Sequence, residues 1–235
     1  MRHHLRAPIR LVTAVVALAL VATGGMPDAA ARSAGSPVAA TGLSAEAPAD
    51  ITTSPVYWNW DPATVAGWSK LVRTDAGVSF TYHTSSLSPR HVVTIWIIVF
   101  NNPENCSTRP CTVPGDVFKA GVQGDFLYGG GHVIGGDGRG NFGGHLPVGE
   151  PSGSGLIEIG MPELAVGLLN PRTAEIQLAL HSHGPAGSGR LLKAQLSSFL
   201  GGCQMFLGPD GIADSPDDMP DAVGECSTFQ YSVHQ

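Results

Sequence analysis

The stretch that decides the fold is Val92-Val93-Thr94-Ile95-Trp96-Ile97-Ile98-Val99-Phe100, and Asn101-Asn102-Pro103 follows it at once. Nearly every residue in this stretch is β-branched or aromatic, and such side chains favour extended backbone. Because the apolar residues are consecutive rather than alternating, the stretch predicts a strand that is covered on both faces. The Asn-Asn-Pro sequence predicts the end of that strand.

Shorter segments on both sides of this stretch also have strand character. Val78, Phe80 and Tyr82 alternate with polar residues, which is the period of a half-buried strand. The other candidate strands are residues 175–183, 190–196 and 228–233. Residues 62–72 fit a short helix and a strand equally well.

Turn residues divide these segments from one another. Twelve glycines lie between Gly129 and Gly155, so turns and bulges are expected there. A short helix is expected near residues 161–169. The pattern predicts an all-β fold, an antiparallel β-sandwich of the jelly-roll or Greek-key kind, with long glycine-rich loops and at most one or two short helices.

The N-terminus has the features of a secretory signal. Arg2, Arg6 and Arg10 precede an apolar run from Leu11 to Ala22, and small residues suited to cleavage follow at 29–31. We therefore expect a signal peptide over 1–31, a flexible Ala/Ser/Pro-rich linker over 32–55 and a single β-sandwich domain over 56–235. The apolar run is shorter than the roughly 20 residues that span a bilayer, so we expect no stable membrane anchor after cleavage.

Charge further limits the classes of partner. The 235 residues include 13 Lys+Arg and 19 Asp+Glu, for a formal net charge of −6. Nucleic-acid binding is not expected, because it needs clustered positive charge. An unknown extracellular ligand is the expected partner.

Four cysteines in a secreted chain predict disulfides rather than a zinc site. Cys106 and Cys111 bracket a short loop, and Cys203 and Cys226 bracket the acidic tail. Proximity in the sequence favours the pairings Cys106–Cys111 and Cys203–Cys226.

The segment Leu180-His181-Ser182-His183-Gly184-Pro185-Ala186-Gly187-Ser188-Gly189 is the sharpest local motif. Side chains two apart on a strand point the same way, so His181 and His183 can reach one transition-metal ion. Two further ligands are needed, and the candidates are His83, His91, His132, His145, Asp125 and Asp137. The alternatives are a solvated strand face with Glu175 and Gln177, or acid-base catalysis.

This motif, His-x-His-Gly-Pro-Ala-Gly-x-Gly with the apolar stretch after it, resembles the central motif of CHRD domains. Those are β-sandwich modules of bacterial secreted proteins and of chordin. The resemblance covers about 20 residues and implies a β-sandwich in a secreted, non-enzymatic module. The chain departs from that family in its Cys-bracketed loops and its acidic tail.

The tail provides a second candidate site. Asp210, Asp214, Asp217 and Asp218 lie around a Gly turn and can supply oxygen ligands to Ca²⁺. The segment is similar to thrombospondin type 3 calcium repeats, but the preceding acidic positions are missing. The alternative is a solvated acidic loop, and no cofactor is certain.

Motifs of covalent and nucleotide chemistry do not point to an enzyme. The chain contains no Gly-x-Ser-x-Gly elbow and no Walker A loop. Gly138 to Gly143 spells G-x-G-x-x-G, but a dinucleotide site needs a helix to open there. The leading hypothesis is a secreted, disulfide-stapled, non-catalytic binding module. The alternative is a metal-dependent enzyme or metal carrier centred on His181 and His183.

Overall fold

The computed structural model describes residues 47–59, 61–201 and 227–235. All of them belong to one compact unit, Ser44–Gln235. The strands are β1 (Asp50–Trp58), β2 (Asp61–Thr74), β3 (Gly77–Thr84), β4 (His91–Phe100), β5 (Gly124–Val133), β6 (Gly140–Pro147), β7 (Glu175–Pro185) and β8 (Thr228–His234). The helical segments are α1 (Gly155–Glu158) and α2 (Gly189–Ser197), with short 3-10 turns η1 (Pro103–Asn105) and η2 (Pro162–Leu164).

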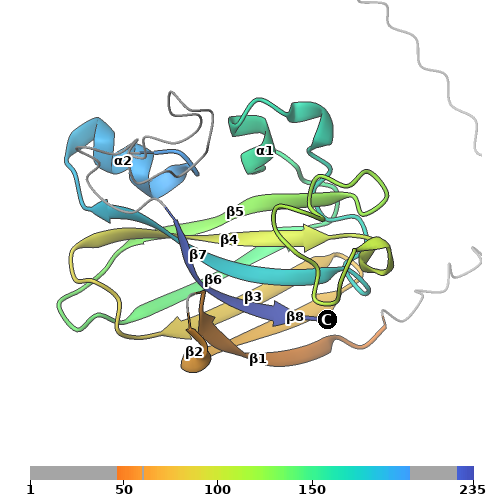
Figure 1. The fold of residues 1–235 in the computed structure, drawn as a ribbon, viewed down its shortest axis with the longest axis horizontal. Helices are drawn as coiled ribbons and strands as arrows, with labels where there is room; N and C mark the ends of the chain where they lie inside the picture. Colours follow the sequence, from red (N-terminus) through yellow and green to blue (C-terminus); the bar gives the residue numbers. More distant parts are fainter. Residues whose placement is uncertain (1–46, 60, 202–226) are drawn as a thin grey trace, which may run out of the picture. The chain divides into compact units, whose positions relative to one another are not determined.

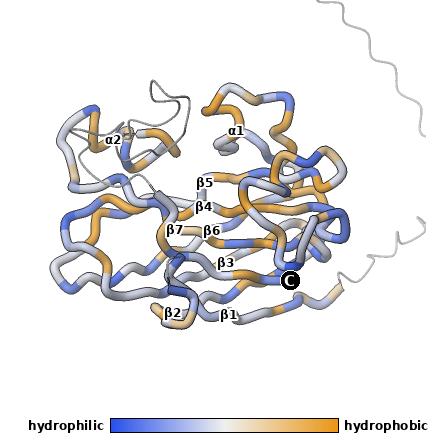
Figure 2. Tube along the Cα trace, in the orientation of Figure 1, coloured by the Kyte–Doolittle hydropathy of each residue, from blue (hydrophilic) through white to orange (hydrophobic). Residues whose placement is uncertain are grey.

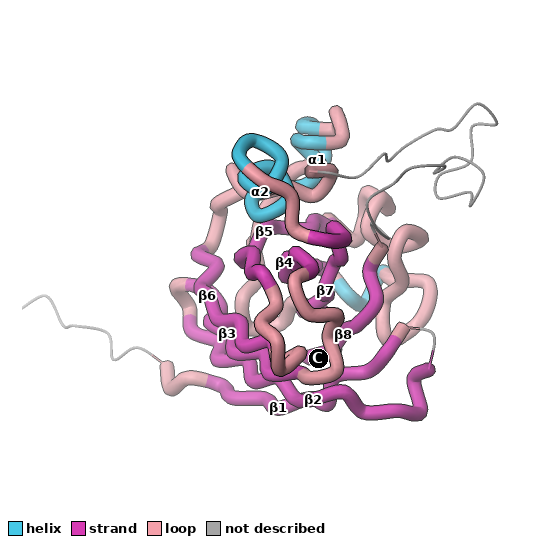
Figure 3. Tube along the Cα trace, turned by 90° about the vertical axis from the view of Figure 1, so that its left-hand side faces the viewer, coloured by secondary structure: helices cyan, strands magenta, loops and turns pink. Residues whose placement is uncertain are grey.

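The eight strands form one antiparallel sheet in the order β5-β4-β7-β8-β1-β2-β3-β6, which confirms the predicted all-β class (Figure 1). The ladder between β8 and β1 is short, with only the pairs Tyr57–Tyr231 and Trp58–Gln230. At this corner the sheet turns, so that the half β5-β4-β7-β8 faces the half β1-β2-β3-β6. Viewed along the strands, the rolled sheet is nearly barrel-shaped (Figure 3).

β4 lies inside this arrangement and confirms the strand expected over 92–100. On its inner side Val93, Ile95 and Ile97 belong to the apolar core between the two halves. On its outer side Trp96 and Ile98 belong to a second apolar cluster, over which the helices lie (Figure 1). Apolar side chains on both faces explain why this stretch has no alternation.

In Figure 2 the loops at the ends of the strands carry many of the hydrophilic residues.

Two glycines allow the edge strands β5 and β6 to approach each other. A Cβ on Gly144 would lie 2.8 Å from Phe80 Cε1 and 3.3 Å from the carbonyl oxygen of Gly129. A Cβ on Gly129 would lie 3.1 Å from Phe80 Cζ. The glycine-rich composition of this region therefore serves close packing around the Phe80 ring as well as turns.

The start of the folded domain differs from expectation. β1 begins at Asp50, so the predicted linker is wrong over 50–55. Arg172 explains the difference, because its guanidinium donates to the carbonyl oxygens of Ala47 and Pro48 and to the carboxylates of Asp50 and Asp75. The rest of the predicted linker and the predicted signal peptide lie outside the described residues.

The other strand expectations have mixed outcomes. The strands expected around 78–82, 175–183 and 228–233 are β3, β7 and β8, and the ambiguous segment 62–72 is part of β2. The strand expected over 190–196 is wrong, because this segment is α2. Gln195 is its buried position, and Leu192, Ala194 and Leu196 are half-buried. Leu192, Gln195 and Leu196 have the i, i+3, i+4 spacing of a helix.

Two smaller predictions have different outcomes. Of residues 161–169, where a short helix was expected, only Pro162–Leu164 is helical, as the 3-10 turn η2. The G-x-G-x-x-G sequence runs into β6 and not into a helix, so it does not have the geometry of a dinucleotide site.

Candidate functional site

The predicted histidine pair lies on β7, on the side of the sheet that also carries Ala179 and the outer apolar cluster. His181 and His183 are 2% and 0% exposed, and their ring centroids are 5.1 Å apart. The alternative of a solvated strand face is therefore wrong. Residues that follow α2 cover the pair. The Phe199 ring stacks on the His181 ring, and the Gly201 carbonyl oxygen is hydrogen-bonded to His183 Nδ1.

His183 uses both of its ring nitrogens in hydrogen bonds. Nδ1 lies 2.7 Å from the carbonyl oxygen of Gly201, and Nε2 lies 2.9 Å from Thr94 Oγ1. A carbonyl only accepts, so Nδ1 carries the hydrogen and Nε2 accepts from the Thr94 hydroxyl. The Thr94 oxygen in turn accepts from Trp96 Nε1 at 2.9 Å. Burial lowers the pKa of His183, so this chain of bonds holds a neutral imidazole.

Within the described part of the chain, His181, unlike His183, is held by ring stacking and not by hydrogen bonds. Its ring stacks on Phe199 with centroids 4.6 Å apart, and among the described residues neither nitrogen has a hydrogen-bond partner. Burial, and to a smaller extent the neighbouring His183, lower its pKa from 6.5 to about 3. His181 is therefore a neutral ring inside an aromatic cluster with Trp96, Phe126 and Phe199.

Neutral imidazoles are the form that binds metal, but the structure does not gather the other predicted ligands around this pair. The described part of the chain contains no group of three or more His, Cys, Asp or Glu placed to hold a metal ion. His83 and His145 lie on the opposite half of the sheet, where they contact Asn141 and Ser79. The metal site at His181 and His183 stays a prediction.

The predicted carboxylate ligands have structural partners instead. Asp125 is fully buried and accepts hydrogen bonds from Ser154 Oγ and from the backbone nitrogens of Phe126, Val166 and Gly167. Burial raises its pKa, although these bonds oppose the rise. Asp137 accepts from the backbone nitrogen of Arg139. Each carboxylate fixes a loop.

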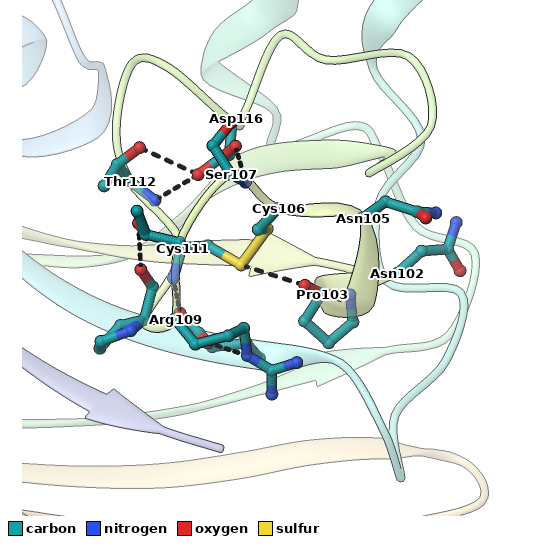
Figure 4. Close-up of a disulfide and its surroundings, with 12 residues drawn as sticks. Asn102, Pro103, Asn105, Cys106, Ser107, Arg109, Cys111, Thr112 and Asp116 are labelled. Atoms are coloured by element: carbon teal, nitrogen blue, oxygen red, sulfur yellow. Dashed lines mark hydrogen bonds and ion pairs between the residues drawn. A yellow bond between two sulfur atoms is a disulfide. The ribbon is translucent and has the colours of Figure 1, made fainter.

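The disulfide Cys106–Cys111 is present, as predicted, and it closes a loop beside β7 (Figure 4). Asp116 holds the loop from one side, because its carboxylate accepts from the backbone nitrogens of Ser107 and Thr112 and from the Thr112 hydroxyl. These bonds hold the pKa of Asp116 well below its usual range. On the other side, the buried carboxylate of Glu175 accepts from the Cys111 backbone nitrogen at 2.8 Å.

Two predictions lie outside the described residues. These are the disulfide Cys203–Cys226 and the calcium site at Asp210, Asp214, Asp217 and Asp218. Among the described residues, no helix is long and apolar enough to cross a membrane.

A site that the sequence did not predict lies on the outer side of β1, β2, β3 and β6, which we call the bare face. Both α-helices lie on the other side of the molecule, next to β5 and away from β1 and β2 (Figure 3). The strand register places three rows across this face: Pro55–Trp68–His83–Asn141, Thr53–Lys70–Thr81–Gly143 and Ile51–Val72–Ser79–His145. Directly paired residues share one side of a sheet, so the side chains of each row lie next to one another, with Gly143 leaving the end of its row open.

Trp68 is the largest exposed side chain in the three rows of the bare face. It is 45% exposed, and its ring lies 4.2 Å from the ring of His83, tilted by 35°. His83 Nδ1 lies 2.6 Å from Asn141 Oδ1, which fixes the imidazole that supports the indole. The hairpin turn between Thr74 and Gly77 sets this register. Recognising that turn in the sequence would have predicted that Trp68 and His83 are paired.

Comparisons of the chain with protein-family models, with curated proteins and with solved structures find no match.

Proposed function

We propose that the protein is a secreted, non-catalytic binding module that holds a neutral polysaccharide on the bare face. The observation that carries the proposal is the exposed indole of Trp68, which stacks on the imidazole of His83 in a face whose side chains are uncharged except for Lys70. An indole presents a flat apolar surface, against which the C–H side of a sugar ring packs.

The fixed position of Trp68 supports this assignment. The supporting imidazole is itself bonded to Asn141, so the indole has a rigid backing and loses little conformational freedom when a ligand binds. Preorganised aromatic side chains contribute most of the energy at many binding surfaces. Isolated exposed apolar residues are common, but an exposed Trp held by a hydrogen-bonded partner is a more specific arrangement.

The polar groups beside Trp68 indicate the class of ligand. Ser79 Oγ lies 2.9 Å from His145 Nδ1 in the outer row, and Thr53 and Thr81 lie in the row between. Hydroxyl, amide and imidazole groups both donate and accept hydrogen bonds, as sugar hydroxyls do. Lys70 is the one Lys, Arg, Asp or Glu within the three rows, which favours an uncharged ligand.

The sequence supports the rest of the proposal. The N-terminal segment has the pattern of a secretory signal, and the disulfide Cys106–Cys111 suits an oxidising compartment. The resemblance to CHRD domains implies the same combination of a secreted β-sandwich and no catalysis.

The test is a sedimentation assay of the purified protein with two insoluble neutral polysaccharides, microcrystalline cellulose and chitin. We expect retention on at least one of them, and we expect Trp68→Ala to weaken it by roughly tenfold or more, since a central aromatic contact contributes about 2 kcal/mol. Lys70→Ala should change retention little, because the proposed ligand carries no charge.

Phe118→Ala is the matched control. Phe118 is also an exposed aromatic residue, 40% exposed, but it lies in the loop after the disulfide and not on the bare face. Retention that is equal in the Trp68 and Phe118 variants would overturn the proposal. Absence of retention on both polymers would overturn it as well.

A further inference from the structure

Two buried polar groups in the space between the two halves of the sheet have no hydrogen-bond partner among the described residues. They are the hydroxyl of Tyr82 and the Nε2 amide nitrogen of Gln230, and both side chains are 0% exposed. Buried polar groups in folded proteins almost always have a partner, which is either another protein group or an ordered water molecule.

The hydrogen bonds around these two groups place them in one polar layer. Thr84 lies two residues beyond Tyr82 on the same side of β3, and its hydroxyl donates to Gln230 Oε1 at 2.7 Å. Ser69 is paired with Tyr82 in the ladder between β2 and β3. The Ser69 hydroxyl donates to Ser232 Oγ at 2.8 Å, and Ser232 lies two residues beyond Gln230 on β8.

Tyr82 is therefore flanked on both sides by side chains that reach across to β8. The inward positions of β8 are Gln230, Ser232 and His234, and all three are polar and buried. This strand lies at the corner where only two residue pairs join β8 to β1. Hydrogen bonds between side chains supplement the ladder there.

The unpaired groups require an acceptor. The Gln230 carbonyl oxygen is bonded to Thr84, and the amide nitrogen can only donate. The Tyr82 hydroxyl also has a hydrogen to donate. A water molecule accepts two hydrogen bonds at once and still has two hydrogens for nearby carbonyl groups. The side chains bonded to Gln230 and Ser69 are the hydroxyls of Thr84 and Ser232 and the imidazole of His234, so among the described residues no carboxylate adjoins the two donors to hold a cation.

We propose that one water molecule binds between the two halves of the sheet and accepts hydrogen bonds from Tyr82 Oη and Gln230 Nε2. It joins β8 to β3 and completes the side-chain contacts at the corner of the sheet. This inference does not depend on the proposed polysaccharide ligand, because the site lies in the interior and the bare face lies outside.

The test is a measurement of water-to-protein cross-relaxation by NMR on the full protein, read at the side-chain amide hydrogens of Gln230. Gln195 is the matched control, because it is also 0% exposed and its Nε2 donates to the carbonyl oxygens of His183 and Pro185 at 2.9 and 3.0 Å. We expect a water cross-peak at Gln230 and none at Gln195.

Tyr82→Phe removes one of the two donors and keeps the ring, so the Gln230 cross-peak should weaken in that variant. If the variant does not fold, the comparison of Gln230 with Gln195 in the unmodified protein decides alone. The absence of a cross-peak at Gln230 would overturn the proposal, and so would a direct hydrogen bond from Gln230 to the Tyr82 oxygen in a crystal structure.

Discussion

At the scale of single residues, His181 and His183 are neighbours with opposite contributions to stability. His183 makes hydrogen bonds through both ring nitrogens, whereas neither nitrogen of His181 has a hydrogen-bond partner among the described residues. A buried polar group without a partner costs about 1–3 kcal/mol. Replacing it with an apolar group of similar size removes that cost.

We therefore expect His181→Leu to leave the free energy of unfolding unchanged or to raise it, by up to about 2 kcal/mol. His183→Leu should lower it by about 2–4 kcal/mol, because Thr94 and Gly201 would lose their buried partner. Urea unfolding of both variants measures the difference. A large loss of stability in His181→Leu, together with loss of stoichiometric zinc or copper, would instead support the metal hypothesis.

His234 makes stability depend on pH. It is buried, it contacts Thr52 and Ser69, and burial followed by the nearby Arg73 lowers its pKa from 6.5 to about 4. Between these two pKa values the unfolded chain binds a proton that the folded protein does not. Acidification therefore favours the unfolded state, and stability falls as the pH drops through this window.

For His234 alone we expect a loss of about 2 kcal/mol between pH 7 and pH 5, since each pKa unit corresponds to about 1.4 kcal/mol. His181 shifts in the same direction and adds to the loss. Urea unfolding at both pH values, with His234→Gln for comparison, measures the contribution. Equal pH dependence in the variant and the unmodified protein would show that His234 is not the source.

At the scale of elements, the contact between the edge strands depends on Gly144. A Cβ there would press on the Phe80 ring, which is only 3% exposed. We expect Gly144→Ala to lower the free energy of unfolding by about 1–3 kcal/mol, the usual cost of overpacking.

Gly143→Ala is the control for this prediction, because a Cβ at Gly143 would have its nearest contact at 3.4 Å, which is ordinary packing. It should change stability by no more than about 0.5 kcal/mol. Thermal unfolding of the two variants compares them. Equal effects would mean that β5 and β6 are not held together through Phe80.

The sequence predicted those elements whose own pattern is sufficient. β4 is apolar on both faces, β3 alternates, and Cys106 and Cys111 are only five residues apart. α2 was missed because Leu192, Ala194 and Leu196 alternate as they would in a strand, while Leu192 and Leu196 also have the i, i+4 spacing of a helix. Its helical form depends on the apolar outer side of β4 and β5, which it covers.

The candidate sites show the same limit. Alternation correctly placed His181 and His183 on one side of a strand, but the residues that bury them come from α2 and the segment after it. Trp68 lies in the segment that the sequence left ambiguous, and its partner His83 comes from the next strand. Burial and cross-strand contacts depend on register, which the local pattern did not supply.

At the scale of the whole molecule, the two outer sides of the rolled sheet differ. The outer side of β4, β5 and β7 carries an aromatic cluster, and α1 and α2 contact β4 and β5 there (Figure 1). The bare face keeps an exposed indole on a hydrogen-bonded support. This asymmetry is the basis for assigning binding to one side of the molecule.

The most direct test of that assignment is a titration of the labelled protein with soluble cello- and chito-oligosaccharides, followed by amide and indole chemical shifts. We predict saturable shifts centred on the Trp68 indole, His83 and Asn141, with little change at His181 and along α2. Shifts centred on His181 and α2, or no saturable shift with either sugar series, would contradict the account.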